Sequence, residues 1–195
     1  MGRPREFDEI QVLEKAMTAF WANGYEATSL TDLVNATGLH KGSLYQAFGN
    51  KHDLFITALS RYLEGMHAQK TALLKGAKTP RDGVRSALHG MLDMSDADAS
   101  YPKGCMAINA LVEMAPHDAE VAKVLENHIQ RMVGSMVDAI TEGQALGQIR
   151  TDRPARVIAG LLLTFMSGLA TQIKGPALTK DLAHELLEAQ LSAVL

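Results

Sequence analysis

Residues 24–55 read GYEATSLTDLVNATGLHKGSLYQAFGNKHDLF. The apolar residues within 29–37 and within 41–48 recur at helical spacing, and Gly38-Leu39 separates the two segments. Two short helices joined by a glycine-containing turn form the unit that many DNA-binding proteins place in a major groove. The stretch therefore predicts a helix-turn-helix over about residues 29–48.

The second helix of this unit has one buried face and one polar face. Leu44 and Phe48 form an i,i+4 pair that we expect to pack inward. Gly42 lets the backbone come close to a partner. The polar face can present donors and acceptors to base edges. We expect DNA contacts from His40, Lys41, Ser43, Tyr45 and Gln46.

Phosphate contacts are expected from the segments around this helix. Lys51 lies in the first turn of the next helix, and Thr28 with Ser29 opens the preceding one, so both positions offer free amides to an anion. Arg3 and Arg5 form a short basic arm that is suited to an adjacent minor groove.

The charge balance argues against an architectural DNA protein without specificity. The whole chain has a formal charge of −3, and the first 51 residues carry a net −1. Non-specific binding depends on phosphate neutralisation, which needs a basic surface. A three-helix unit with a merely solvated polar face remains the alternative to DNA binding.

The amino-acid sequence of the motif favours DNA binding over these alternatives. The segments 24–33 and 36–55, including Gly38 and the GSLY at 42–45, resemble the TetR family of repressors over about residues 6–66. His52 replaces the acidic residue that is usual there. The resemblance implies a homodimer that binds a near-palindromic operator and releases it when a ligand binds in the C-terminal part. It also implies phosphate contacts from Thr28, Tyr45 and Lys51. The base contacts that it implies come from His40, Lys41, Ser43 and Gln46.

The rest of the chain also reads as helices, so the predicted fold is all-α with about nine helices. We expect a DNA-binding domain at 6–66 and a ligand-sensing and dimerisation domain at 80–195. The chain has one cysteine and begins without an apolar stretch, which indicates a cytoplasmic protein. The apolar run 157–173 contains polar interruptions, so we interpret it as a buried helix and expect no membrane association.

Cys105 is a candidate sensor of electrophiles or oxidants. It follows Gly104 at an expected helix N-terminus, a position that favours the thiolate. The segment 104–110, GCMAINA, with Glu113, resembles a subset of the family in which some members sense reactive species through such a cysteine. A small buried apolar role is the alternative.

Methionines of the C-terminal part favour a cavity for an apolar effector with few polar anchors, although they also fill cores. The candidate lining residues are Met91, Tyr101, Asn109, His128, Met132, Met136 and Phe165.

Small residues in 157–173 and leucines in 179–195 suggest that the last two helices form the homodimer interface, with burial inside one subunit as the alternative. No metal-ligand spacing, cofactor motif or catalytic constellation is apparent in the sequence. An all-α enzyme or carrier is the less favoured function.

Overall fold

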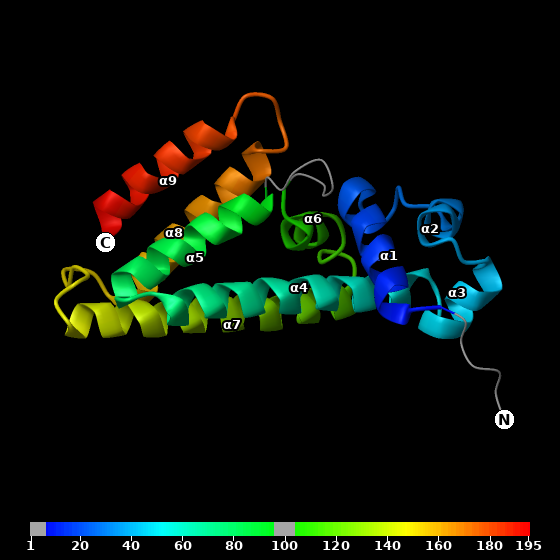
Figure 1. Ribbon diagram of the computed structural model, residues 1–195, viewed down its shortest axis with the longest axis horizontal. Coiled ribbons are helices and arrows are strands. Elements are labelled where there is room, and N and C mark those ends of the chain that lie inside the picture. Colours follow the sequence, from blue (N-terminus) through cyan, green and yellow to red (C-terminus); the bar gives the residue numbers. More distant parts are fainter. Residues whose placement is uncertain (1–6, 96–103) are drawn as a thin grey trace.

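A computed structural model describes residues 7–95 and 104–195, and these residues form nine α-helices (Figure 1). The all-α prediction is confirmed. The helices are α1 Glu9–Asn23, α2 Leu30–Thr37, α3 Lys41–Phe48, α4 Lys51–Gly76, α5 Pro80–Ser95, α6 Met106–Glu113, α7 Ala119–Ala145, α8 Ala155–Gln172 and α9 Lys180–Val194.

Side-chain caps fix most of the helix starts. In α1, α2, α4, α7 and α9, the residue before the helix accepts hydrogen bonds from first-turn amides, as its side-chain oxygen satisfies donors that have no helical partner. The helix α8 has no side-chain cap: Pro154 stands at its N-cap, and the carboxylate of the nearby Asp152 pairs with Arg150.

The helices form an elongated molecule with a small head and a larger body. Figure 1 shows α2 and α3 at one end, with α1 between them and the body, and α4 running from the head along the body beside α7. The helix α4 is 26 residues long, so it spans about 39 Å at 1.5 Å per residue. Head and body therefore share one continuous helix.

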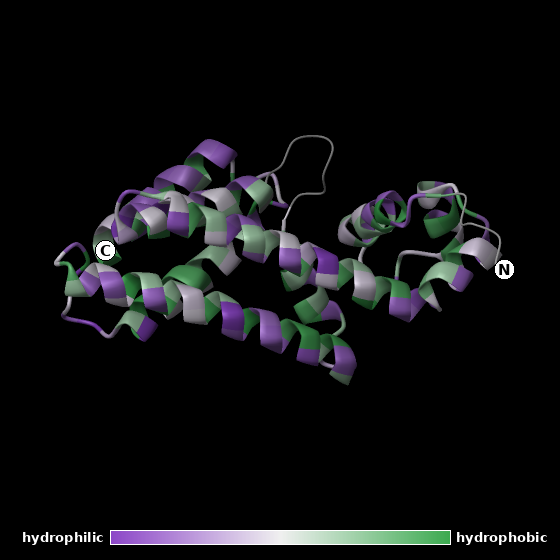
Figure 2. Ribbon diagram, turned by 60° about the horizontal axis from the view of Figure 1, so that its bottom comes forward, coloured by the Kyte–Doolittle hydropathy of each residue, from purple (hydrophilic) through white to green (hydrophobic). Residues whose placement is uncertain are grey.

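Two hydrophobic clusters hold the molecule together. The first joins α1–α4 to α6 and to the start of α7, and includes Phe20, Phe55 and Met106. The second joins α5, α8 and α9 to the later part of α7, and includes Met136 and Ile158. Hydrophobic and hydrophilic residues alternate along the helices (Figure 2), as expected of helices that bury one face.

Two large apolar residues lie outside the hydrophobic clusters. Ile10 is 58% exposed and Ile129 is 42% exposed. In α1 the buried face runs through Val12, Ala16 and Phe20, and Met17 beside them is also buried.

The last two helices each have one buried and one exposed apolar face. Ile158 and Leu162 of α8 are fully buried, whereas Val157 and Leu161 of the same helix are about two-fifths exposed. The helix α8 is long and apolar enough, by length and composition only, to cross a membrane. Its buried face packs in the second cluster, as expected of a core helix.

Candidate nucleic-acid interface and ligand cavity

The helix α3 presents a polar surface that a buried leucine holds in place. Leu44 has no exposed surface and packs in the first hydrophobic cluster. Around it, the predicted DNA-contacting residues lie on the outside of the head: His40, Lys41, Gly42 and Gln46 are exposed, and Ser43 and Tyr45 are half-buried. The structure thus brings these six residues to one helix, as the sequence predicted.

The N-terminus of α3 is open. Its N-cap, His40, makes no side-chain hydrogen bond to the helix, whereas the caps of α1, α2 and α4 do. A Cβ built on Gly42 would meet no atom within 4 Å. First-turn amides without partners attract anions such as phosphate. This end of α3 can therefore approach a DNA backbone closely.

The side-chain hydroxyls at the start of α2 make hydrogen bonds within the head. Thr28 is fully buried, and its hydroxyl donates to the carbonyl of Gly24 at 2.6 Å. Ser29 is exposed, and its hydroxyl donates to the Asp32 carboxylate at 2.6 Å and accepts from the Asp32 amide. The hydrogen bonds from Ser29 hold the pKa of Asp32 below its usual value. The predicted phosphate contacts of Thr28 and Ser29 stay predictions.

Lys51 at the start of α4 lies against an aromatic ring. Its Nζ is 4.4 Å from the centroid of Tyr25, which keeps the ammonium at the edge of the head. Lys41 Nζ is 5.8 Å from the ring of Tyr45 on the same helix. Arg3 and Arg5 lie outside the described residues.

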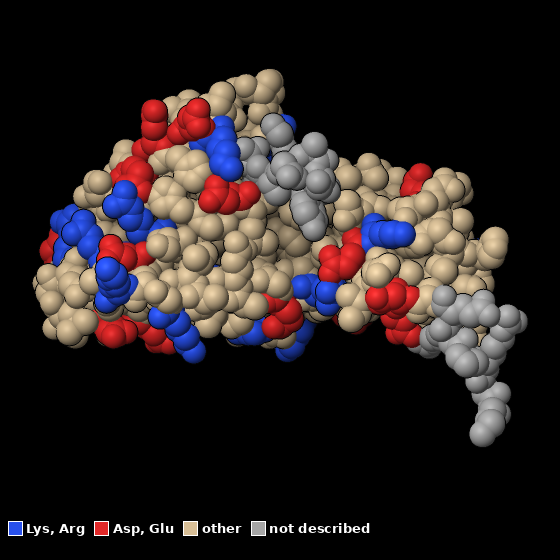
Figure 3. All heavy atoms as spheres, viewed as in Figure 1, with Lys and Arg blue, Asp and Glu red and all other residues tan. Residues whose placement is uncertain are grey.

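Acidic and basic side chains are interspersed on the face shown in Figure 3, without a large field of either sign. This distribution agrees with the small net charge of the chain. Individual contacts at α3, rather than a broad basic surface, must therefore provide most of any selectivity for DNA.

A carboxylate of α6 ties the head to the body, and sequence reasoning missed its role. Glu113 accepts hydrogen bonds from the backbone N–H of Tyr25 at 3.0 Å and of Glu26 at 2.8 Å. Gly24 has φ +84°, which favours glycine, and a Cβ there would lie 2.7 Å from a Glu113 oxygen. A second link joins His52 Nε2 to the Asp118 carboxylate at 2.6 Å.

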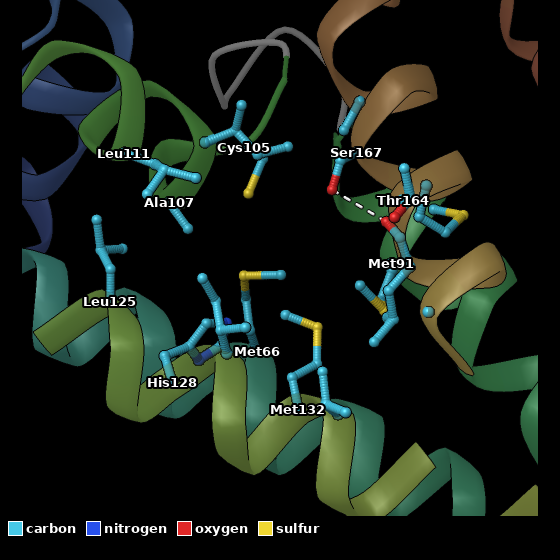
Figure 4. Close-up of a pocket in the computed structure, with 17 residues that line it drawn as sticks. Met66, Met91, Cys105, Ala107, Leu111, Leu125, His128, Met132, Thr164 and Ser167 are labelled. Atoms are coloured by element: carbon cyan, nitrogen blue, oxygen red, sulfur yellow. Dashed lines mark hydrogen bonds between the residues drawn. The ribbon is translucent and has the colours of Figure 1, made fainter. Parts of the chain in front are cut away.

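A cavity of about 270 Å³ lies in the body, with walls from α4, α5, α6, α7 and α8 (Figure 4). Four of the residues that we predicted to bind or sense the effector line it: Met91, Cys105, His128 and Met132. Met66 and Leu125 add to its largely apolar surface, and Thr164 and Ser167 of α8 provide hydroxyl groups. Its lining comes from both hydrophobic clusters, so the cavity lies where they meet.

Three other residues that we predicted to contact the effector, all within the described part of the chain, do not line this cavity. Met136 is fully buried in the second cluster, and Phe165 packs against that cluster and lines a shallow hollow beside Val157 and Leu161. Asn109 faces α1 and α8, where it accepts from Lys174 Nζ at 2.9 Å. Tyr101 lies outside the described residues. One-dimensional periodicity does not tell which side of a buried helix meets an empty space.

Cys105 is the N-cap of α6 and is 7% exposed. Its sulfur points into the cavity in Figure 4, and the hydroxyl of Tyr62 donates to it at 3.5 Å. Burial raises the pKa of Tyr62 well above its usual value, so this hydroxyl keeps its proton and remains a donor to the sulfur.

Two buried basic side chains lie at one wall of the cavity, since His128 lines the cavity itself and Lys70 lines a small hollow that shares His128 with it. Lys70 of α4 and His128 of α7 are 3% and 6% exposed. Burial, with the nearby Arg131 cation, lowers the pKa of Lys70 to about 8. Burial lowers the pKa of His128 to about 4, and the charge of Lys70 contributes, so the imidazole is neutral at pH 7.

Comparison with known proteins places the chain in a family. Residues 12–58 match the family described as bacterial regulatory proteins, tetR family, and residues 80–184 match the tetracyclin repressor-like C-terminal domain. The chain is 31% identical over 180 residues to the HTH-type transcriptional repressor ComR of Escherichia coli K12, covering 92% of this chain and 86% of that protein. It is 33% identical over 150 residues to the uncharacterized HTH-type transcriptional regulator YezE of Bacillus subtilis 168, covering 76% of each.

Among solved structures, the fold is similar to a cysteine mutant of the TetR family regulator CifR complexed with 26-base-pair double-strand operator DNA. The TM-score is 0.88 at 29% identity, and the match covers 100% of both chains. This chain is therefore a helix-turn-helix transcriptional regulator. It belongs to the TetR family, with the family's N-terminal helix-turn-helix and helical C-terminal domain.

Proposed function

We propose that this protein is a homodimeric repressor that binds operator DNA through α3 and releases it when an effector enters the cavity. The exposed polar face of α3, held in place by the buried Leu44, carries this proposal. The similar CifR structure contains operator DNA, which supports the same role here. The proposed setting is the cytoplasm.

The exposed apolar faces of α8 and α9 support dimerisation through these two helices. Val157, Leu161, Leu182 and Leu186 are each about two-fifths exposed although they are large and apolar. In a two-fold symmetric interface the same patch on each subunit buries the other. Such a dimer presents two copies of α3 to two half-sites about 34 Å apart, or a multiple of this distance.

Release would follow if the effector binds better to a conformation in which the two copies of α3 have a different spacing. The effector lowers operator affinity only by the ratio of its affinities for the two conformations. The cavity lies where the two hydrophobic clusters meet. An effector that fills it therefore changes how the first cluster, which includes the helices of the head, packs against the second cluster.

A cysteine-based response is the second candidate. The Cys105 sulfur faces the cavity and accepts a hydrogen bond from the Tyr62 hydroxyl, so an electrophile that enters the cavity meets this sulfur. Loss of the response to an electrophile in Cys105→Ser, with the response to a reversible ligand retained, would separate covalent sensing from ligand binding.

The test is fluorescence anisotropy on the DNA upstream of the protein's own gene, with competitor DNA and varied salt, followed by a genome-wide selection of binding sites. We expect competitor-resistant binding with two subunits per site. Lys41→Ala and Tyr45→Ala should each weaken it, whereas Lys123→Ala on the exposed side of α7 should not. Failure of both the upstream DNA and the selection to yield a preferred site would contradict the proposal.

A further inference from the structure

Lys70 is a buried cation without a counterion. Its side chain is 3% exposed, and Nζ donates to the Ser135 hydroxyl at 2.5 Å and to the Met132 carbonyl at 3.3 Å. Within residues 7–95 and 104–195, no carboxylate lies within 4.0 Å of Nζ. The nearby Arg131, in contrast, forms an ion pair with Glu64. Lysine is rarely buried unless it is paired, so this ammonium has capacity for an anion.

His128 adds an unpartnered polar atom beside it. The residue is 94% buried, and its Nε2 atom makes no hydrogen bond in the described part of the chain. Buried ring nitrogens are normally satisfied, so an unsatisfied one that borders a cavity points to a missing partner. His67 Nδ1, one turn before Lys70 on α4, is likewise buried and unpartnered.

The groups around this site give it a positive character. From α4 come Glu64, His67 and Lys70, and from α7 come His128 and Arg131. The Glu64 carboxylate is engaged by Arg131, so it does not neutralise Lys70. Among the described residues of α5, α6 and α8 that line the cavity, the one titratable group is the Cys105 thiol.

The basic site adjoins the apolar cavity. A small hollow of about 10 Å³ borders Lys70 and His67, and it shares Met66, Met91, His128 and Met132 with the lining of the cavity. Figure 4 shows Met66, Met132 and His128 together on one wall, opposite Cys105. The flexible thioethers that separate the two spaces can move apart at low cost.

The shape of the combined space limits the ligand. The apolar part, about 270 Å³, corresponds to roughly nine water-sized groups at about 30 Å³ each. A chain or ring of this size fills it, and one charged group can reach the basic end. A cationic head would be repelled there, and a neutral ligand would leave Lys70 without a counterion.

We propose that the effector is an amphipathic monocarboxylate of about ten non-hydrogen atoms, with its apolar body in the cavity and its carboxylate between Lys70 and His128. This inference rests on the proposed function, because it names the chemistry of the effector of that regulator. Lys70 supplies the charge and His128 a ring N–H, so the carboxylate gives the ammonium a counterion and the His128 Nε2 atom a hydrogen-bond partner.

Calorimetric titration of the full-length protein without DNA tests the proposal, with octanoate, octan-1-ol and octylamine as probes. Wild type should bind octanoate at least tenfold more tightly than either other compound at pH 7. Lys70→Met, which keeps the side-chain length, should weaken octanoate binding about tenfold or more and leave octanol binding within threefold. Lys75→Met, on the exposed surface of the same helix, should change neither.

Proton linkage provides a readout that a merely structural role would not affect. A bound carboxylate favours the charged form of Lys70, whose pKa in the free protein is about 8. Octanoate binding near pH 8 should therefore take up protons, measured as a dependence of the binding enthalpy on the ionisation enthalpy of the buffer. The uptake should disappear in Lys70→Met and persist in Lys75→Met.

Three results would overturn the proposal: no octanoate binding at millimolar concentration, equal binding of octanoate and octanol, or unchanged octanoate binding in Lys70→Met. Circular dichroism verifies that the variant is folded, and Lys70→Arg should retain octanoate binding if charge is what matters. Operator binding by the ligand-free protein is measured separately. If the protein binds operator DNA but does not bind octanoate as expected, it remains a regulator and only this effector class is wrong. If operator binding is absent, the proposed function itself is wrong.

Discussion

Glu113→Ala should loosen the attachment of the head to the body by a measurable amount. The substitution removes the acceptor of two backbone N–H groups, those of Tyr25 and Glu26, which lie 88 and 87 residues away in sequence. A hydrogen bond to a charged group contributes about 1.5–3 kcal/mol. Glu113 is half-buried and Glu26 is exposed, so water partly replaces the lost acceptor. We therefore expect a loss of about 2–3 kcal/mol in the free energy of unfolding.

Urea unfolding at fixed protein concentration measures this loss. Trp21 is the single tryptophan of the chain, is 4% exposed in α1, and reports on the head by fluorescence. Glu113→Gln keeps one acceptor oxygen but places an NH₂ group against the other amide, so it should recover less than half of the loss.

The matched control is Glu126→Ala on the exposed surface of α7, where the carboxylate accepts, among the described residues, only from Gln130 four residues on. It should cost less than about 0.5 kcal/mol. A Glu113→Ala protein within 0.5 kcal/mol of wild type would refute the reasoning, because the two amides would then not depend on this carboxylate.

Three further predictions concern the core, the DNA interface and the buried lysine. Leu44→Ala should destabilise the protein by about 2–5 kcal/mol in thermal or urea unfolding, since this fully buried leucine positions α3, and a smaller loss would mean that the head repacks. Lys51→Ala should weaken binding to all operators alike and reduce the slope of log affinity against log salt by about one, whereas a change of sequence preference would indicate a base contact instead. The pKa of Lys70 is about 8 in the folded protein and 10.5 in the unfolded chain, so the unfolded chain binds more protons between these two pH values. The free energy of unfolding of ligand-free wild type, relative to Lys70→Met, should therefore rise by about 3 kcal/mol from pH 8 to 10.5. Urea unfolding of both proteins at several pH values measures this rise, and a difference that does not change with pH would contradict a buried ammonium.

Much of the fold could be predicted from the sequence because its signals are local. Residues such as Ser29, Asn50 and Thr179 cap their helices through bonds to amides two or three positions on, so a short window contains the whole interaction. The same locality explains why the core-facing side of α3 could be predicted, because Leu44 and Phe48 lie four residues apart and both pack in or against the first cluster.

Contacts between distant segments could not be predicted in this way. Glu113 and Lys70 are each ordinary charged residues in their own helices, and their importance arises from neighbours more than 60 residues away. Met136 and Met132 are four residues apart on α7, yet only Met132 borders the cavity. The burial of Thr28, which follows from its packing beside α1, was likewise not visible in the local sequence.

The first hydrophobic cluster has a consequence for protein engineering. Trp21 stacks edge-on against Tyr62, with ring centroids 5.0 Å apart, and Cys105 and Met106 of the body belong to the same cluster. A fragment that ends near residue 66 would leave this cluster open to solvent on one side. Chimeras that exchange the head between relatives should therefore transfer α6 together with α1–α4, because the residues that pack in this one cluster are discontinuous in sequence.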